Sequence, residues 1–102
     1  MHANHTYIVL FYDHSERVQP MQQLLNHLPT RPKVDSVENF QQLLTLLDQK
    51  VPDLLIVYVN NPMESHIDYL KSLRCDNGID EIPVYVFTEL PEQQTLMDLL
   101  AN

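Results

Sequence analysis

The chain has 102 residues, 44% of them hydrophobic, and a formal net charge of −8. This length and hydrophobic content predict one domain over residues 1–102 with a modest core, and they argue against disorder. The acidic balance argues against nucleic-acid binding, because phosphate backbones attract basic patches. The absence of an apolar run near the roughly 20 residues of a membrane span, and of a signal-peptide core, predicts a cytoplasmic protein that does not bind a membrane.

Four apolar runs read as strands. They are rich in β-branched and aromatic residues, and the first, third and fourth are apolar at both alternating positions. This pattern is typical of strands buried on both faces of a parallel sheet. In chain order the runs are residues 7–12, a short run at 33–35, 54–59 and 84–87.

The first two intervening stretches have helical spacing of apolar residues. The first helix is expected to start near Ser15 or Gln19, with Pro20 in or close to its first turn. Asp35 and Glu38 have the spacing of a capping box and predict the start of the second helix. The apolar face of that helix is expected to comprise Val37, Phe40, Leu43, Leu44 and Leu47.

Two further helices complete the pattern. The third runs from Met63 to Leu73, and the fourth begins with Pro91 as a favourable first residue. Four strand–helix units in alternation predict an α/β domain whose parallel sheet has helices on both faces. In such open sheets, sites form at the carboxyl ends of the strands. The polar residues expected at those ends are Tyr12, Asp13, His14, Asn60, Asn61, Thr88 and Glu89.

These strand ends resemble those of response-regulator receiver domains of the chemotaxis type. From Pro52 to Pro62 the chain has Pro-Asp, four apolar residues, Tyr58 and, four residues later, proline, which resembles the family's phosphoacceptor strand. Residues 82–88 are similar to its fourth strand, with Thr88 at the end. The resemblance covers almost the whole chain. It implies a flavodoxin-like three-layer sandwich with parallel strand order 2-1-3-4, and bacterial two-component phosphorelay signalling.

The chain departs from the family pattern within the site. Tyr58 stands at the phosphoacceptor position, and the adjacent acidic pair is reduced to Tyr12-Asp13. Thr88 is kept, but Glu89 replaces the small residue that usually follows it. The fifth strand and helix, with the family's lysine, find no match in these 102 residues. The resemblance therefore implies a truncated, degenerate pseudo-receiver of four strand–helix units.

Phosphoryl transfer to a carboxylate needs an acceptor aspartate, Mg²⁺ held by carboxylates, and cations that offset the developing charge. The substitutions remove most of these parts. We therefore expect a non-catalytic, phosphorylation-independent interaction module without a cofactor, in which Mg²⁺ binding is disfavoured. Two alternatives remain open: a divergent phosphorelay receiver that keeps some response to phosphate or Mg²⁺, and a small-ligand or metal-binding domain at the strand ends.

Tyr58 also has a packing interpretation. Its ring can fill the space that an acidic pocket would leave, with its hydroxyl hydrogen-bonded to Asp13 or Thr88. Few residues near the strand ends have side chains of the types that bind metal ions. The weak candidates are Asp13, His14 and Asn60, with Glu64 and His66 further along the chain. The single cysteine, Cys75, excludes an intrachain disulfide and reads as an ordinary loop residue.

The fourth strand is expected to lie at an edge of the sheet. Without a fifth strand beside it, it becomes an apolar edge that can template pairing with another chain. The fourth helix is expected to add exposed leucines to this surface. The interaction edge would comprise Val84, Tyr85, Val86, Phe87, Leu96, Leu99 and Leu100. We therefore expect self-association as a dimer, or binding of a protein partner.

Overall fold

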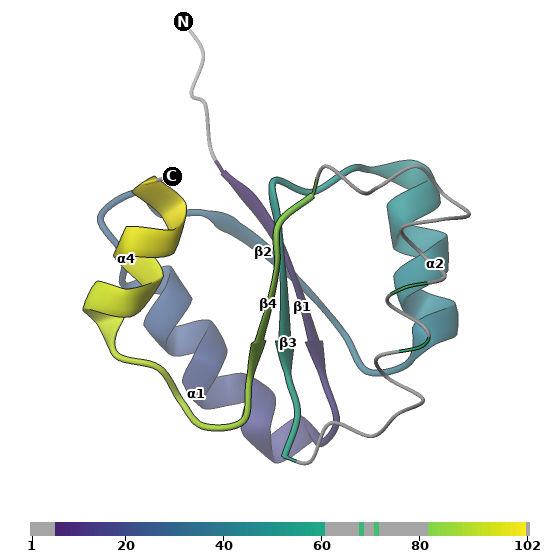
Figure 1. The fold of residues 1–102 in the computed structure, drawn as a ribbon, viewed down its shortest axis with the longest axis horizontal. Coiled ribbons are helices and arrows are strands. Elements are labelled where there is room, and N and C mark those ends of the chain that lie inside the picture. The colour runs from purple at the N-terminus through teal and green to yellow at the C-terminus, as the bar shows by residue number, and fades with distance from the viewer. Residues whose placement is uncertain (1–5, 61–67, 69–70, 72–81, 102) are drawn as a thin grey trace, which may run out of the picture.

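A computed structural model describes residues 6–60, 68, 71 and 82–101. The described part contains four strands and three helices (Figure 1). They are β1 (Tyr7–Tyr12), α1 (Ser15–Asn26), β2 (Lys33–Val37), α2 (Phe40–Gln49), β3 (Leu54–Tyr58), β4 (Val84–Phe87) and α4 (Gln93–Ala101). The helix expected over residues 63–73 and the loop at Cys75 fall almost wholly outside the described residues.

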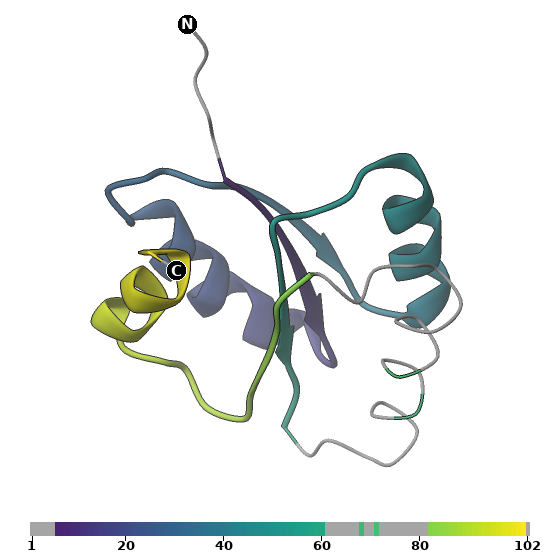
Figure 2. The same ribbon diagram turned by 45° about the horizontal axis from the view of Figure 1, so that its top comes forward.

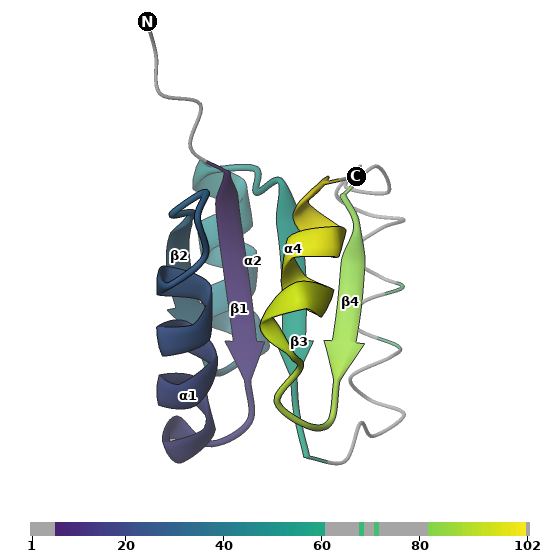
Figure 3. The ribbon, with the colours of Figure 1, turned by 90° about the vertical axis from the view of Figure 1, so that its left-hand side faces the viewer.

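The four strands form one parallel sheet in the order β2-β1-β3-β4, which Figure 3 shows from one face. This is the predicted order. In the register, Tyr12 lies opposite Tyr58, and Tyr58 lies opposite Phe87. All five residues of β3 are buried, because it is a central strand whose two faces are both covered.

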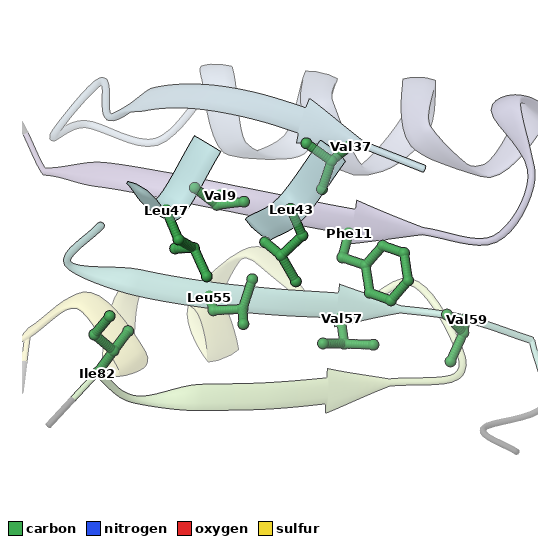
Figure 4. Close-up of a cluster of buried hydrophobic side chains, with 9 residues drawn as sticks. All are labelled: Val9, Phe11, Val37, Leu43, Leu47, Leu55, Val57, Val59 and Ile82. Atoms are coloured by element: carbon green, nitrogen blue, oxygen red, sulfur yellow. The ribbon is translucent and has the colours of Figure 1, made fainter. Parts of the chain in front are cut away.

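Helices cover both faces of the sheet. α1 and α4 lie side by side on one face, and α2 lies on the other (Figures 1 and 2). Each face has its own apolar cluster. Toward α2, Figure 4 shows Val9, Phe11, Val37, Leu43, Leu47, Leu55, Val57, Val59 and Ile82. Toward α1 and α4, the buried residues are Ile8, Leu10, Met21, Leu25, Leu28, Leu54, Ile56, Tyr58 and Leu96. These layers are the predicted three-layer sandwich.

Helix α1 starts at Ser15, the earlier of the two expected starts. Pro20 is its sixth residue, about one turn further in than expected. A proline there cannot donate to the carbonyl of Glu16, four residues before it. Both residues are exposed, so water can satisfy that carbonyl.

The predicted start of α2 is wrong. Strand β2 continues to Val37 and places Asp35 inside the sheet, so the helix cap falls later, at Asn39. The Asn39 side-chain oxygen accepts a hydrogen bond from the Gln42 backbone N–H at 2.9 Å. The Gln42 side-chain oxygen in turn accepts from the Glu38 N–H at 3.0 Å. Leu44, which was expected on the apolar face of this helix, is 44% exposed, whereas Leu43 and Leu47 are buried.

The predicted role of α4 is wrong as well. Leu96 is 1% exposed, and Leu99 and Leu100 are partly buried against the same cluster. These side chains turn toward the sheet and α1, so they do not extend an exposed edge. The helix also begins at Gln93, two residues after the expected Pro91. No helix among the described residues has the length and apolarity needed to cross a membrane.

Candidate functional site

The parallel topology brings three strand ends to one edge of the sheet. Since Tyr12, Tyr58 and Phe87 lie side by side in the register, the residues that follow them are neighbours as well. Figure 3 shows the three arrowheads of β1, β3 and β4 at the same end of the molecule. The sequence therefore placed Asp13 and Thr88 correctly at a common edge with Tyr58.

Asp13 links β1 to β3. One of its carboxylate oxygens accepts a hydrogen bond from the Asn60 backbone N–H at 2.6 Å. The other lies 3.6 Å from the Nε of Arg17, and both atoms are shielded from solvent. That distance is slightly too long for a hydrogen bond, and neither atom has another partner within the described residues. They therefore act as an ion pair, each compensating the charge of the other.

Arg17, in the first turn of α1, is the residue that the sequence reasoning missed. One terminal guanidinium nitrogen donates to the Thr88 backbone carbonyl at 2.8 Å, and the other makes a long contact of 3.5 Å with the Asn60 side-chain oxygen. The guanidinium carbon lies 4.3 Å from the centroid of the Tyr58 ring, which is a cation–π contact. A single cation therefore touches residues from all three strand ends. The spacing of four residues between Asp13 and Arg17, which suits an ion pair, was the one feature of the sequence that could have indicated this role.

Tyr58 is 6% exposed and belongs to the apolar cluster under α1 and α4. This burial agrees with the packing interpretation of its ring. The expected hydrogen bond from its hydroxyl to Asp13 or Thr88 is not formed. One Asp13 oxygen accepts a hydrogen bond from the Asn60 backbone N–H instead. The Thr88 backbone carbonyl accepts a hydrogen bond from Arg17. The Tyr58 ring instead contacts the Arg17 guanidinium through its face.

The remaining candidate residues are more peripheral. His14 is the exposed N-cap residue of α1 and makes no side-chain cap, while Tyr12 is half-buried and Glu89 is exposed. Within the described ranges, no three His, Cys, Asp or Glu side chains come together as metal ligands. Glu64 and His66 lie outside those ranges. Protein groups engage both oxygens of the Asp13 carboxylate.

A pocket on the described surface lies away from these strand ends. It measures about 890 Å³ and opens between β2 and α2. Its lining is mostly polar and includes Ser36, Gln42 and Thr45, but none of the residues around Arg17. At the strand ends, the Arg17 guanidinium and the Tyr58 ring lie in contact with one another.

The fold is of the receiver type, an α/β sandwich with parallel strand order 2-1-3-4. Among solved structures, the chain is similar to the chemotaxis response regulator CheY4 of Vibrio cholerae, with a TM-score of 0.74. The alignment covers 96% of this chain and 98% of that one, at 13% sequence identity. The similarity confirms the receiver-like fold. No protein-family model matches the chain, and a search of curated proteins found no match either.

Proposed function

We propose that the chain is a two-component-type signalling domain that works as a protein-interaction module, without phosphorylation and without catalysis. The observation that supports this proposal is the occupation of the strand-end site by Arg17 and Tyr58. The receiver-like fold supports a signalling role, and such a role fits a cytoplasmic protein. The departures at Tyr12, Tyr58 and Glu89 support the loss of phosphorylation.

The physical argument concerns charge. A phosphorylated receiver needs an acceptor carboxylate, a divalent cation and further positive charge around the transferred group. Here the acceptor position carries a phenol, and Arg17 already compensates Asp13. A divalent cation would have to displace a guanidinium that also binds Thr88 and the Tyr58 ring. We therefore propose that Arg17 replaces a bound metal and keeps the strand ends in one arrangement.

The interaction surface that we propose is β4. It is the outer strand of the described sheet on that side, and Val86 is 47% exposed. Outer strands with exposed apolar side chains pair readily with a second chain. Leu90, also 47% exposed, follows β4 in the loop that leads to α4. We propose that a second copy, or another protein, binds along β4.

Incubation with acetyl phosphate and Mg²⁺, followed by intact-mass measurement, tests the loss of phosphorylation. We expect no aspartyl phosphate on the wild type and none on Tyr58→Asp, because Arg17 remains in the site. An active receiver treated in parallel shows that the reagent works. A phosphate adduct on the wild-type chain would contradict the proposal, and an adduct on Tyr58→Asp would show that position 58 alone limits the chemistry.

Light scattering over a range of concentrations tests the β4 surface. We expect the wild type to self-associate and Val86→Lys to be monomeric. The matched control is Val51→Lys, since Val51 is 69% exposed but lies before β3, away from β4. Self-association that survives Val86→Lys would refute β4 as the surface. A wild type that stays monomeric at high concentration would remove the second copy as the partner.

A further inference from the structure

A second polar cluster lies at the opposite end of the sheet, around Tyr7, the first residue of β1. Its hydroxyl donates a hydrogen bond to a carboxylate oxygen of Asp35 at 2.7 Å. Its backbone N–H donates to a carboxylate oxygen of Asp53 at 2.8 Å. Hydrogen bonds thus fix both the backbone and the hydroxyl of Tyr7, and the residue packs partly against the apolar cluster under α2.

Two lysines converge on this ring from different elements. The Nζ atoms of Lys33 and Lys50 each lie 5.8 Å from the centroid of the Tyr7 ring. Lys33 begins β2 and its backbone N–H donates to the Thr6 carbonyl at 2.8 Å, while the N–H of Lys50 donates to the Leu46 carbonyl at 2.8 Å. Both backbones are therefore anchored, and the sheet and α2 bring the two side chains together.

Within the part of the chain that the structure describes, neither ammonium group has a carboxylate within 4.0 Å. Among the described residues, the ion pair of Asp13 with Arg17 is the one formed within 4.0 Å, and it lies at the other end of the sheet. The neighbouring Lys33 amine, and to a smaller extent desolvation, lower the pKa of Lys50, and the negative charge of Asp35 opposes this effect. The Tyr7 ring attracts both cations but does not neutralise them. Two adjacent, exposed ammonium groups are thus left facing one another in a chain whose net charge is −8.

We propose that Lys33 and Lys50, whose ammonium groups the Tyr7 ring holds side by side, together bind a phosphate dianion, free or as a small phosphomonoester. Lysine binds phosphate as a point charge, and one dianion between two ammonium groups would remove their mutual repulsion. The carboxylates of Asp35 and Asp53 are directed to the hydroxyl and the N–H of Tyr7, and their charge limits the affinity. This site is independent of the function proposed for the strand ends.

The test is a titration of the full chain with inorganic phosphate at pH 7.5 and constant ionic strength, with NMR detection of the lysine side-chain resonances. We expect saturable shifts at Lys33 and Lys50 and none at the exposed Lys71, which serves as the internal reference. Lys33→Gln and Lys50→Gln should each weaken binding by about tenfold or more. The matched control Lys71→Gln should leave the affinity unchanged. A second measurement, the pKa of the Lys50 amine, should rise when phosphate is present.

A parallel titration with glycerol phosphate distinguishes a site for free phosphate from a site for phosphomonoesters. Equal shifts with both compounds indicate a site for phosphomonoesters, and shifts with inorganic phosphate alone indicate a site for the free ion. Equal, non-saturating shifts at all three lysines would overturn the proposal. So would an affinity that Lys33→Gln and Lys50→Gln leave unchanged.

Discussion

The guanidinium of Arg17 lies over the face of the Tyr58 ring, 4.3 Å from its centroid. Arg17 comes from the start of α1 and Tyr58 from the end of β3, so this contact ties a helix to a central strand. The same guanidinium faces Asp13 and donates to the Thr88 carbonyl. The positive charge at the strand ends is thus supplied by the chain itself.

Replacing Arg17 by alanine should destabilise the domain by about 1–3 kcal/mol. The change leaves the Asp13 carboxylate without its cation and the Thr88 carbonyl without its donor. Urea unfolding at pH 7 measures the free energy. Gln19→Ala, an exposed position of the same helix, is the matched control and should change stability by less than about 0.5 kcal/mol. An Arg17→Ala variant as stable as this control would show that the contacts are incidental.

The ring of Tyr58 should matter far more than its hydroxyl. Tyr58→Ala should cost about 3–5 kcal/mol, because it leaves a cavity in a buried cluster and removes the surface under Arg17. Tyr58→Phe should change stability by less than about 0.5 kcal/mol, because the hydroxyl is not hydrogen-bonded to Asp13 or Thr88. The comparison of the two variants by urea unfolding tests this. A large loss in Tyr58→Phe would reveal a polar role for the phenol.

Tyr7→Phe should reduce stability by about 1 kcal/mol at neutral pH, because it removes the hydrogen bond to Asp35. Burial, followed by the hydrogen bond to Asp35 and its charge, raises the pKa of Tyr7 above the ordinary 10.0. The unfolded chain therefore releases this proton first, so the contribution of Tyr7 is complete below pH 10 and declines above it.

The difference in unfolding free energy between wild type and Tyr7→Phe should accordingly be constant from pH 7 to about 9 and shrink above pH 10. All other side chains are common to both proteins, so their contributions largely cancel in this difference. Urea unfolding at a series of pH values gives the curve. A difference that grows above pH 10 would contradict the assigned direction of the pKa shift.

Asn39→Ala should cost about 1 kcal/mol, since it removes the side-chain acceptor at the start of α2. Asn39→Asp keeps an acceptor and should preserve most of the stability. The neighbouring Gln41→Ala, exposed and outside the cap, is the control. If Asn39→Ala and Gln41→Ala were equally stable in thermal unfolding, the cap would contribute nothing.

Local patterns in the sequence were enough to place most strands. Residues 7–12 and 84–87 were predicted with the observed bounds, because continuous apolar runs of that length suit buried parallel strands. The order 2-1-3-4 followed from the resemblance to receivers and is confirmed. The common edge of Asp13, Tyr58 and Thr88 followed from parallel topology, since carboxyl ends of parallel strands meet.

The tertiary structure decided how those residues are used. Spacing along the chain could not show that β2 extends to Val37 and moves the cap of α2 to Asn39, or that Leu96 turns inward against α1. Nor could it show that Arg17 occupies the site. The partners of Arg17, at Tyr58, Asn60 and Thr88, are distant in sequence, and a cation–π contact or a hydrogen bond forms only when the fold brings its atoms together. The sequence by itself determined that Asp13, Tyr58 and Thr88 lie at one edge of the sheet, whereas the fold determined that Arg17 lies among them and contacts all three.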